Sequence, residues 1–202
     1  MLSGRRYDPL KRVLDLTVGT LTLPVVLPVL GLCAVAIALD TPGPIVFKQR
    51  RTGRDGRPFE IYKFRTMVAN AEELKKDLQH LSVVPYPDFK LIDDPRVTRV
   101  GRILRTTSLD ELPQIWNVLR GDMSLVGPRP TSFAPDTYDL WHARRLEVRP
   151  GLTGLWQIIG RNTTDFDERS RLDEQYIRTR SLAVDLKILV RTVPEMIRQH
   201  GF

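Results

Sequence analysis

The sequence has 202 residues, enough for one domain with a small appendage and too few for two full enzyme domains. Hydrophobic residues make up 42% and charged residues 27% of the chain, a composition that excludes wholesale disorder and low-complexity sequence. The 31 Lys and Arg residues outnumber the 24 Asp and Glu residues and give a formal net charge of +7. We therefore expect a negatively charged partner, which charge alone leaves open as nucleic acid, anionic lipid or a phosphorylated substrate.

Cysteine and histidine usage gives no indication of thiol or zinc chemistry. The single cysteine, Cys33, excludes an internal disulfide and lies in an apolar run, where it acts as a small hydrophobic residue. The three histidines are far apart in the chain and follow no metal-ligand spacing.

The most apolar stretch of the chain is Leu16–Leu39, which has 24 residues and no charged side chain. About 20 such residues suffice for a helix to span a bilayer. Pro24 and Pro28 lie near its middle, however, and an interior proline removes a backbone hydrogen bond and kinks or breaks a helix. Basic residues flank the stretch on both sides, and the positive-inside rule would keep both flanks in the cytoplasm.

These features predict that residues 1–42 form a membrane-associated re-entrant hairpin, a helix-break-helix that enters one leaflet and returns to the same face. Pro24 and Pro28 mark the break. A kinked helix that spans the bilayer stays open as an alternative. A buried core helix of a soluble protein is disfavoured, because the stretch has no polar face to turn toward water.

Residues 43–202 are expected to form one cytosolic domain, so that the chain is an α+β protein in which helix predominates. Two stretches rich in β-branched and aromatic residues, Pro44–Arg50 and Phe59–Phe64, flank a turn-forming segment and predict a small β-hairpin. The last helix is amphipathic, and two placements stay open for it, in the membrane interface or against the core. Helical periodicity is present at Asn70–Leu81, Leu109–Arg120, Asp136–Glu147, Phe166–Arg180 and Leu182–Gln199.

A basic cluster follows the apolar stretch, since residues 48–65 contain seven Lys and Arg residues and two acids. Such a cluster next to a membrane segment binds anionic head groups, and it is equally suited to a diphosphate substrate. Nucleic acid is disfavoured, because no nucleic-acid motif is present.

Asp110 and Glu111 are the most informative carboxylates. Ser108 and Glu111 have the spacing of a capping box, so these acids could simply start a helix. A helix start also presents free N–H groups and the positive end of the helix dipole, which bind phosphate. Two adjacent carboxylates can hold Mg²⁺ together with substrate phosphate, so capping alone and phosphate chemistry both stay open at this point.

Arg129 stands between Pro128 and Pro130, and the two prolines stiffen the loop around a guanidinium with five donors. This arrangement predicts an anion clamp. Glycines and arginines recur in Arg149–Gly154 and Gly160–Asn162, where glycine permits either close backbone approach to a ligand or a turn with positive φ.

Taken together and in this order, these segments resemble the bacterial sugar transferase family. Its members are the monotopic phosphoglycosyl transferases that load a sugar phosphate onto a polyprenyl phosphate carrier. The resemblance runs from about Lys11 to Ile197. Besides the proline-interrupted apolar stretch, it rests on Lys11–Asp15, Gln49–Gly53, Ile61–Met67, Ser108–Gln114, Gly121–Pro130 and Arg149–Gly154.

The resemblance implies that residues 43–202 are a catalytic sugar transferase domain. Asp110 would attack the β-phosphorus of a UDP-sugar, release UMP and carry a covalent phosphosugar, which polyprenyl (undecaprenyl) phosphate then takes over. The resemblance assigns Glu111 to the catalytic pair and Mg²⁺ as cofactor to Asp110 and Glu111. The family's phosphate-binding basic residues correspond to Lys63, Arg105, Arg129 and Arg161.

The same resemblance implies a place on the cytoplasmic face of the bacterial inner membrane. Its expected partners are a UDP-sugar, polyprenyl phosphate and an anionic lipid membrane, with no nucleic acid, and a homodimer stays open. Where some members break the hairpin with Ser-Pro, this chain has Leu23-Pro24, and we expect it to be the minimal form of the family. Two other classes of function stay open: a non-catalytic membrane-anchored module that binds nucleotide or partners, and a glycosyltransferase that releases UDP.

Overall fold

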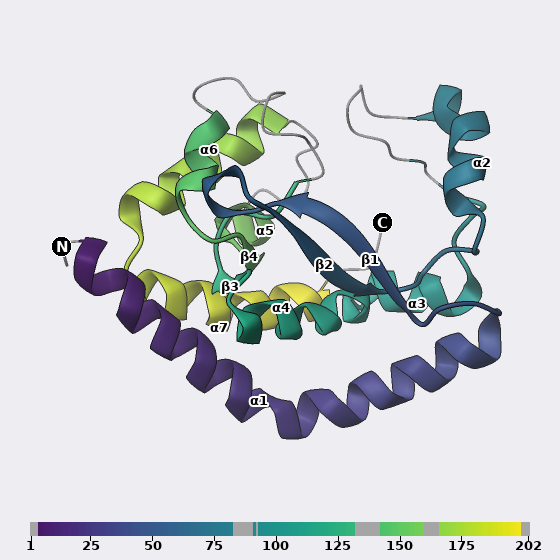
Figure 1. Ribbon diagram of the computed structural model, residues 1–202, viewed down its shortest axis with the longest axis horizontal. Coiled ribbons are helices and arrows are strands. Elements are labelled where there is room, and N and C mark those ends of the chain that lie inside the picture. The colour runs from purple at the N-terminus through teal and green to yellow at the C-terminus, as the bar shows by residue number, and fades with distance from the viewer. Residues whose placement is uncertain (1–3, 83–90, 92, 132–141, 160–165, 199–202) are drawn as a thin grey trace.

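The computed structural model describes residues 4–82, 91, 93–131, 142–159 and 166–198. The described chain is mostly helical and contains two small two-stranded sheets, which confirms the α+β class (Figure 1). Its strands are β1 (Val46–Thr52), β2 (Pro58–Phe64), β3 (Ser124–Val126) and β4 (Gly151–Thr153). Its α-helices are α1 (Gly4–Asp40), α2 (Ala71–Leu78), α3 (Arg99–Thr106), α4 (Ile115–Arg120), α5 (Leu155–Ile159), α6 (Phe166–Thr179) and α7 (Leu182–Arg198). Short 3-10 helices are η1 (Arg54–Gly56), η2 (Gln79–Leu81), η3 (Leu109–Gln114) and η5 (His142–Glu147).

The long apolar helix α1 runs without interruption through Pro24 and Pro28, so the expected break into two helices is wrong. The helix bends in its middle instead, and both arms rise from the bend toward the rest of the protein (Figure 1). Each proline lacks one N–H and its ring displaces one carbonyl, while the neighbouring residues keep their helical bonds. Within the described residues, Tyr7–Asp40 is the helix long and apolar enough to cross a membrane.

The N-terminal arm of α1 is tied to the domain by buried polar contacts. Arg12 donates two hydrogen bonds, of 2.6 and 2.8 Å, to backbone carbonyls in the last turn of α4. Asp15 is almost fully buried and accepts from the Ser124 hydroxyl and the Leu125 N–H, both at 3.0 Å. These bonds fix the first turns of α1 against α4 and β3.

A second buried contact joins the same arm to α7. Asp185, which is fully buried, accepts from the Tyr7 hydroxyl at 2.7 Å and from Lys11 Nζ at 3.0 Å. Its other oxygen accepts from the Tyr176 hydroxyl at 2.7 Å. A buried carboxylate is costly without such partners, so the network specifies where α1 lies relative to α6 and α7.

The C-terminal end of α1 is tied to the same domain. Arg65 donates to the backbone carbonyls of Thr41 and Pro42 at 2.6 and 2.9 Å. Asp40 accepts from the Val100 N–H at 3.2 Å, which satisfies one of the free donors at the start of α3. Both arms of α1 are therefore bonded to one folded unit.

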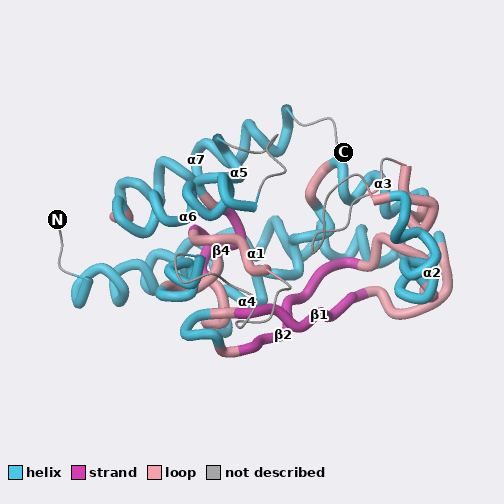
Figure 2. Tube along the Cα trace, turned by 90° about the horizontal axis from the view of Figure 1, so that it is seen from above, coloured by secondary structure: helices cyan, strands magenta, loops and turns pink. Residues whose placement is uncertain are grey.

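The predicted β-hairpin is confirmed. Its first strand, β1, begins and ends two residues later than expected. β1 and β2 pair antiparallel, from Val46 opposite Phe64 to Thr52 opposite Pro58. The second sheet is a parallel pair, β3 with β4, which the sequence did not predict. Seen from above, the hairpin and the α5–α7 helices lie on opposite sides of α4 (Figure 2).

The helical predictions are confirmed for α6 and α7, and the predicted helix 70–81 is confirmed as α2 followed by η2. Two other predicted helices need correction. The predicted helix 109–120 is a 3-10 helix followed by α4, because Pro113 cannot donate a regular α-helical bond. The segment 136–147 is 3-10 helix at 142–147, and its earlier part lies outside the described residues. The sequence missed α3 and α5, which have eight and five residues and are too short for clear periodicity.

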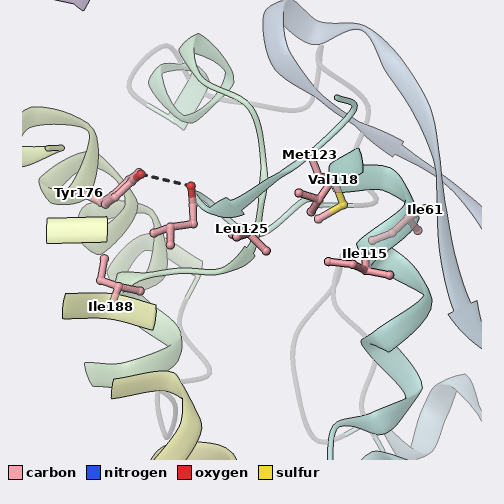
Figure 3. Close-up of a cluster of buried hydrophobic side chains, with 8 residues drawn as sticks. Ile61, Ile115, Val118, Met123, Leu125, Tyr176 and Ile188 are labelled. Atoms are coloured by element: carbon pink, nitrogen blue, oxygen red, sulfur yellow. Dashed lines mark hydrogen bonds between the residues drawn. The ribbon is translucent and has the colours of Figure 1, made fainter. Parts of the chain in front are cut away.

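The main core joins the two sides of the molecule through α4. Ile115 and Val118 of α4 meet Met123 and Leu125, and Tyr176 and Ile188 complete the cluster from α6 and α7 (Figure 3). The dashed bond in that view runs from the Tyr176 hydroxyl to the Val126 carbonyl, at 3.2 Å. A smaller cluster packs the second arm of α1 onto the domain through Cys33, Ile37, Phe64 and Leu104.

α7 packs on the domain with one face, through buried Asp185 and Ile188, and leaves Val190 72% exposed on the other. Its predicted place in a membrane interface stays a prediction.

Candidate functional site

The carboxylate pair lies on η3, directly after a left-handed turn. α3 ends at Thr106, and Ser108 then adopts φ 57°, a conformation that is uncommon for a residue with a side chain. The Ser108 side chain caps nothing, and Glu111 uses its carboxylate elsewhere, so the capping-box interpretation is wrong. The strained turn redirects the chain, and Glu111 then faces the hairpin, where Lys63 binds it.

Glu111 is held by two cations. Lys63 Nζ donates to Oε1 at 2.7 Å, and Arg129 forms a two-pronged contact, with Nη1 at 3.0 Å from Oε2 and Nη2 on Oε1. Burial alone would raise the pKa of Glu111, but the charges of Arg129 and Lys63 outweigh it and hold the pKa well below its usual range. Glu111 is therefore ionised, and it also raises the pKa of Arg129.

Lys63 reaches Glu111 because of its place on β2. Side chains two residues apart share one face of a strand, and Ile61 points into the main core, so Lys63 points the same way beside η3. The strand itself is anchored by Asn117 of α4, which is fully buried. Its Oδ1 accepts from the Tyr62 N–H at 3.1 Å, and its Nδ2 donates to the Glu60 carbonyl at 2.6 Å.

Arg129 is positioned from its backbone. Arg145 donates to the Arg129 carbonyl at 3.0 Å and, from the same nitrogen, to Asp173 at 2.6 Å. Both side chains of the Arg145–Asp173 pair are almost fully buried. The flanking prolines and this bond together restrict the loop that presents the guanidinium. The role of Arg129 as an anion clamp stays a prediction.

The glycines around this loop serve the contact between β3 and β4. A Cβ added to Gly151 would lie 2.1 Å from the Gly127 nitrogen, and one added to Gly127 would lie 2.6 Å from the Arg149 carbonyl. Gly127, Gly151 and Gly154 do not have a positive φ. Glycine is therefore required at Gly127 and Gly151 because the two backbone segments approach each other closely, and not because of a ligand.

Asp110 differs from Glu111 in its hydrogen bonds and in the direction of its pKa shift. Within the described part of the chain, no group hydrogen-bonds to its carboxylate. Burial, and then the charge of Glu111, raise the pKa of Asp110, while Lys63, Arg129 and Arg105 partly oppose that rise. Asp110 is therefore a partly buried carboxylate without a hydrogen-bond partner among the described residues and with a raised pKa. The adjacent carboxylate of Glu111 has its charge balanced by Lys63 and Arg129.

The other predicted site residues divide into three groups. Arg105 donates to the Thr66 hydroxyl at 2.9 Å, and its charge acts on Asp110 without a direct bond. Arg161 lies outside the described residues. Pro24 and Pro28 belong to the bend of α1 and do not enter the carboxylate cluster, so four predicted residues meet there: Lys63, Asp110, Glu111 and Arg129.

The expected Mg²⁺ fits these residues in part. Among the described residues, no group of three or more His, Cys, Asp or Glu side chains could hold a metal ion. Mg²⁺ commonly uses one or two carboxylates plus substrate phosphates, and the unengaged Asp110 can supply such an oxygen. Glu111 could do so only by releasing Lys63 or Arg129. The donor set suits an ion that arrives with a diphosphate.

Comparison with known proteins places these features in one family. A sequence profile described as bacterial sugar transferase matches residues 6–199. Galactosyl transferase CpsE of Streptococcus agalactiae is 47% identical over 195 residues, which cover 95% of this chain and 43% of that protein. An undecaprenyl-phosphate galactose phosphotransferase of Salmonella typhimurium is 42% identical over 205 residues, covering 99% of this chain and 43% of that protein. The chain thus spans less than half the length of these two relatives.

A third relative is closer in size. A UDP-glucose:undecaprenyl-phosphate glucose-1-phosphate transferase of Caulobacter vibrioides is 47% identical over 201 residues, covering 94% of this chain and 70% of that protein.

Proposed function

Because the chain belongs to the bacterial sugar transferase family, we propose that it transfers a sugar 1-phosphate from a UDP-sugar to polyprenyl phosphate and releases UMP. One observation carries this proposal. Asp110 is an unengaged carboxylate with a raised pKa, and it adjoins Glu111, Lys63 and Arg129, whose charges are balanced around it. This is the combination that a carboxylate nucleophile for phosphorus needs.

The reaction is a two-step displacement at one phosphorus atom. A carboxylate oxygen of Asp110 attacks the β-phosphorus of the UDP-sugar, the bond to the bridging oxygen breaks, and UMP leaves with that oxygen. A phosphate oxygen of the acceptor then attacks the same phosphorus, the bond to Asp110 breaks, and the product is a polyprenyl diphosphate sugar. Each step exchanges one P–O bond for another, so no oxidant or reductant is required.

Lys63 and Arg129 have a defined part in both steps. In the structure they neutralise Glu111, and an incoming diphosphate offers oxygens of the same charge and geometry. We infer that the substrate phosphate shares the donors of Lys63 and Arg129 with Glu111. Glu111 orients these two cations and keeps them from binding Asp110. Bound Mg²⁺ would offset further negative charge on the diphosphate.

Asp110→Asn tests the proposal, because asparagine keeps the shape of the side chain and is not a nucleophile for phosphorus. We expect no UMP above background from UDP-sugars with undecaprenyl phosphate and Mg²⁺, whereas the exposed-site control Asp77→Asn keeps full activity. Wild type should carry radiolabel from a β-³²P-labelled UDP-sugar, and EDTA should suppress turnover. Full UMP release by Asp110→Asn would refute the mechanism.

The released nucleotide separates the other classes of function. UDP instead of UMP would indicate a glycosyltransferase that moves the sugar alone. Binding without release of either nucleotide would indicate a non-catalytic module. A panel of UDP-sugars with UMP as the readout identifies the sugar, which the described residues do not specify.

We also propose that α1 is re-entrant and holds the domain on the cytoplasmic face of the inner membrane. Both arms are bonded to one folded unit, which supports a common side for the two ends of the helix. Large apolar side chains along its length face outward, including Leu21, Val25, Leu32 and Leu39, which are 71% to 84% exposed. Such a surface is stable against lipid and costly against water.

Cysteine labelling of sealed vesicles tests this topology. In a Cys33→Ala background, single cysteines at exposed Pro9 and Arg57, before and after the uncharged stretch Leu16–Leu39, should react with an impermeant maleimide from the same side. Labelling from opposite sides would show a spanning helix. The homodimer stays a prediction.

A further inference from the structure

A cavity of about 340 Å³ lies between α1, η3, α5 and α7. Its volume is in the range of about 300–1,000 Å³ that is usual for small-molecule sites. Glu111 and Ser108 form part of its wall, so it adjoins the carboxylate cluster described above. Of the four residues of that cluster, Glu111 lines the cavity, and Asp110, Lys63 and Arg129 do not.

The wall is predominantly apolar. Val18 and Val26 line it from α1, Leu152 and Ile158 from β4 and α5, and Leu189 from α7. Thr153 and Thr192 also line it, and their hydroxyls bond to one another at 2.8 Å. A sugar or a nucleotide needs many polar partners when it is buried, so an apolar ligand fits this wall better.

One wall of the cavity is the proposed membrane helix, and this identifies the occupant. Thr22 of α1 and Val193 of α7 are exposed residues that also line the cavity, so its wall reaches the surface beside the proposed membrane helix. Glu111 in the cavity wall is bonded to Lys63 and Arg129, two cations that suit a phosphate. An apolar chain that ends in a phosphate matches both ends.

We propose that this cavity holds the isoprene units next to the phosphate of the polyprenyl acceptor, and this inference rests on the proposed function. The remainder of the chain stays in the bilayer beside α1. The cavity thereby sets the acceptor phosphate on the side of Asp110 that adjoins the membrane helix, and it selects an isoprenoid by its first units and not by its full length.

Two tryptophan substitutions from opposite walls test the proposal, each with a matched control. Val193→Trp and Thr22→Trp would fill the cavity from exposed positions that tolerate a larger side chain. Val190→Trp and Leu21→Trp place the same residue on the same helices at positions 72% and 73% exposed, outside the cavity wall. The assay measures kcat and KM for undecaprenyl phosphate, and separately UMP release in a single turnover without acceptor.

For both cavity variants we expect KM for undecaprenyl phosphate to rise at least about tenfold, because the displaced units lose apolar contact. The single-turnover release of UMP should be unchanged, and the controls should match wild type. Farnesyl phosphate, a short acceptor, should show the same rise, because the cavity holds only the units nearest the phosphate.

Three results would overturn the inference. Equal KM values in cavity variants and controls would mean that the acceptor does not use the cavity, as for a space filled by bilayer lipid. Loss of single-turnover UMP release in the cavity variants would assign the cavity to the donor. A rise with undecaprenyl phosphate but none with farnesyl phosphate would place the contact farther along the chain. Absence of UMP from wild type would instead refute the proposed function.

Discussion

Replacing Asn117 by alanine should loosen the hairpin that carries Lys63. The Asn117 amide is fully buried and bridges α4 to the free edge of β2 through two hydrogen bonds, with the Tyr62 N–H and the Glu60 carbonyl. Alanine leaves both backbone groups without these partners and removes the contacts of the amide itself. Asn117 is not among the groups that act on Asp110, so we expect the change to affect the site through the placement of β2.

The expected destabilisation follows from those two bonds. A lost hydrogen bond at a partly buried backbone group costs about 1 kcal/mol, and a buried group left unpaired costs about 1–3 kcal/mol. Together the two groups predict a loss of roughly 2–4 kcal/mol, which lowers Tm by roughly 4–16 °C for a chain of this size. Asn117→Asp should be no better, since a carboxylate oxygen would then face the Glu60 carbonyl.

The single cysteine provides the assay. Cys33 is 6% exposed and packs between α1 and the domain, so a fluorogenic maleimide reports its exposure on heating. Trp116→Ala is the matched control, because Trp116 precedes Asn117 on α4 and is 59% exposed. We also expect Asn117→Ala to lower kcat/KM for the UDP-sugar at temperatures well below its Tm. Equal Tm values for the two variants would refute the idea that this amide holds the hairpin.

Two further predictions concern the carboxylates and the glycines. Because burial and Glu111 raise the pKa of Asp110, the rate of UMP release should fall with decreasing pH at values above the usual Asp pKa of about 3.9. Glu111→Gln removes a negative neighbour and should move this limb to lower pH, whereas Lys63→Met removes a cation and should move it to higher pH; a common direction would contradict the assigned causes. Gly151→Ala should prevent stable folding, because its Cβ would meet the Gly127 nitrogen, while Gly31→Ala, with nothing within 4 Å, should raise stability by up to about 1 kcal/mol in the same melting assay.

Sequence reasoning was most successful where the signal is local. The prolines of α1 located the point where the helix departs from a straight line, because the loss of a backbone donor acts at the residue itself, although the predicted break is a bend in one continuous helix. The β-branched stretches predicted the β1–β2 hairpin for the same reason, since its partners are separated by a short turn. The basic residues of the hairpin were identified, although the sequence did not show which one turns toward Glu111.

The remaining features depend on contacts between distant segments. β3 and β4 have three residues each and pair across 24 intervening residues, a length at which neither pattern nor turn chemistry is informative. In the sequence Asn117 is an ordinary polar residue of a predicted helix. Its burial and its hydrogen bonds to β2 are visible only in the structure. Arg145 and Asp173 are likewise ordinary surface types whose pairing beneath Arg129 requires the folded chain.

The capping box fails for a reason that bears on function. In a capping box the Glu side chain returns to the backbone at the start of its own helix, which would leave no carboxylate for Lys63 and Arg129. Here Ser108 is left-handed, and the 3-10 geometry after it turns Glu111 toward those two cations. Arg12 then bonds the last turn of α4, the helix that continues from η3, to the first arm of α1. The backbone that places the carboxylates is thus fixed directly to the apolar helix, so the depth of α1 in the membrane would set the height of Asp110 above it.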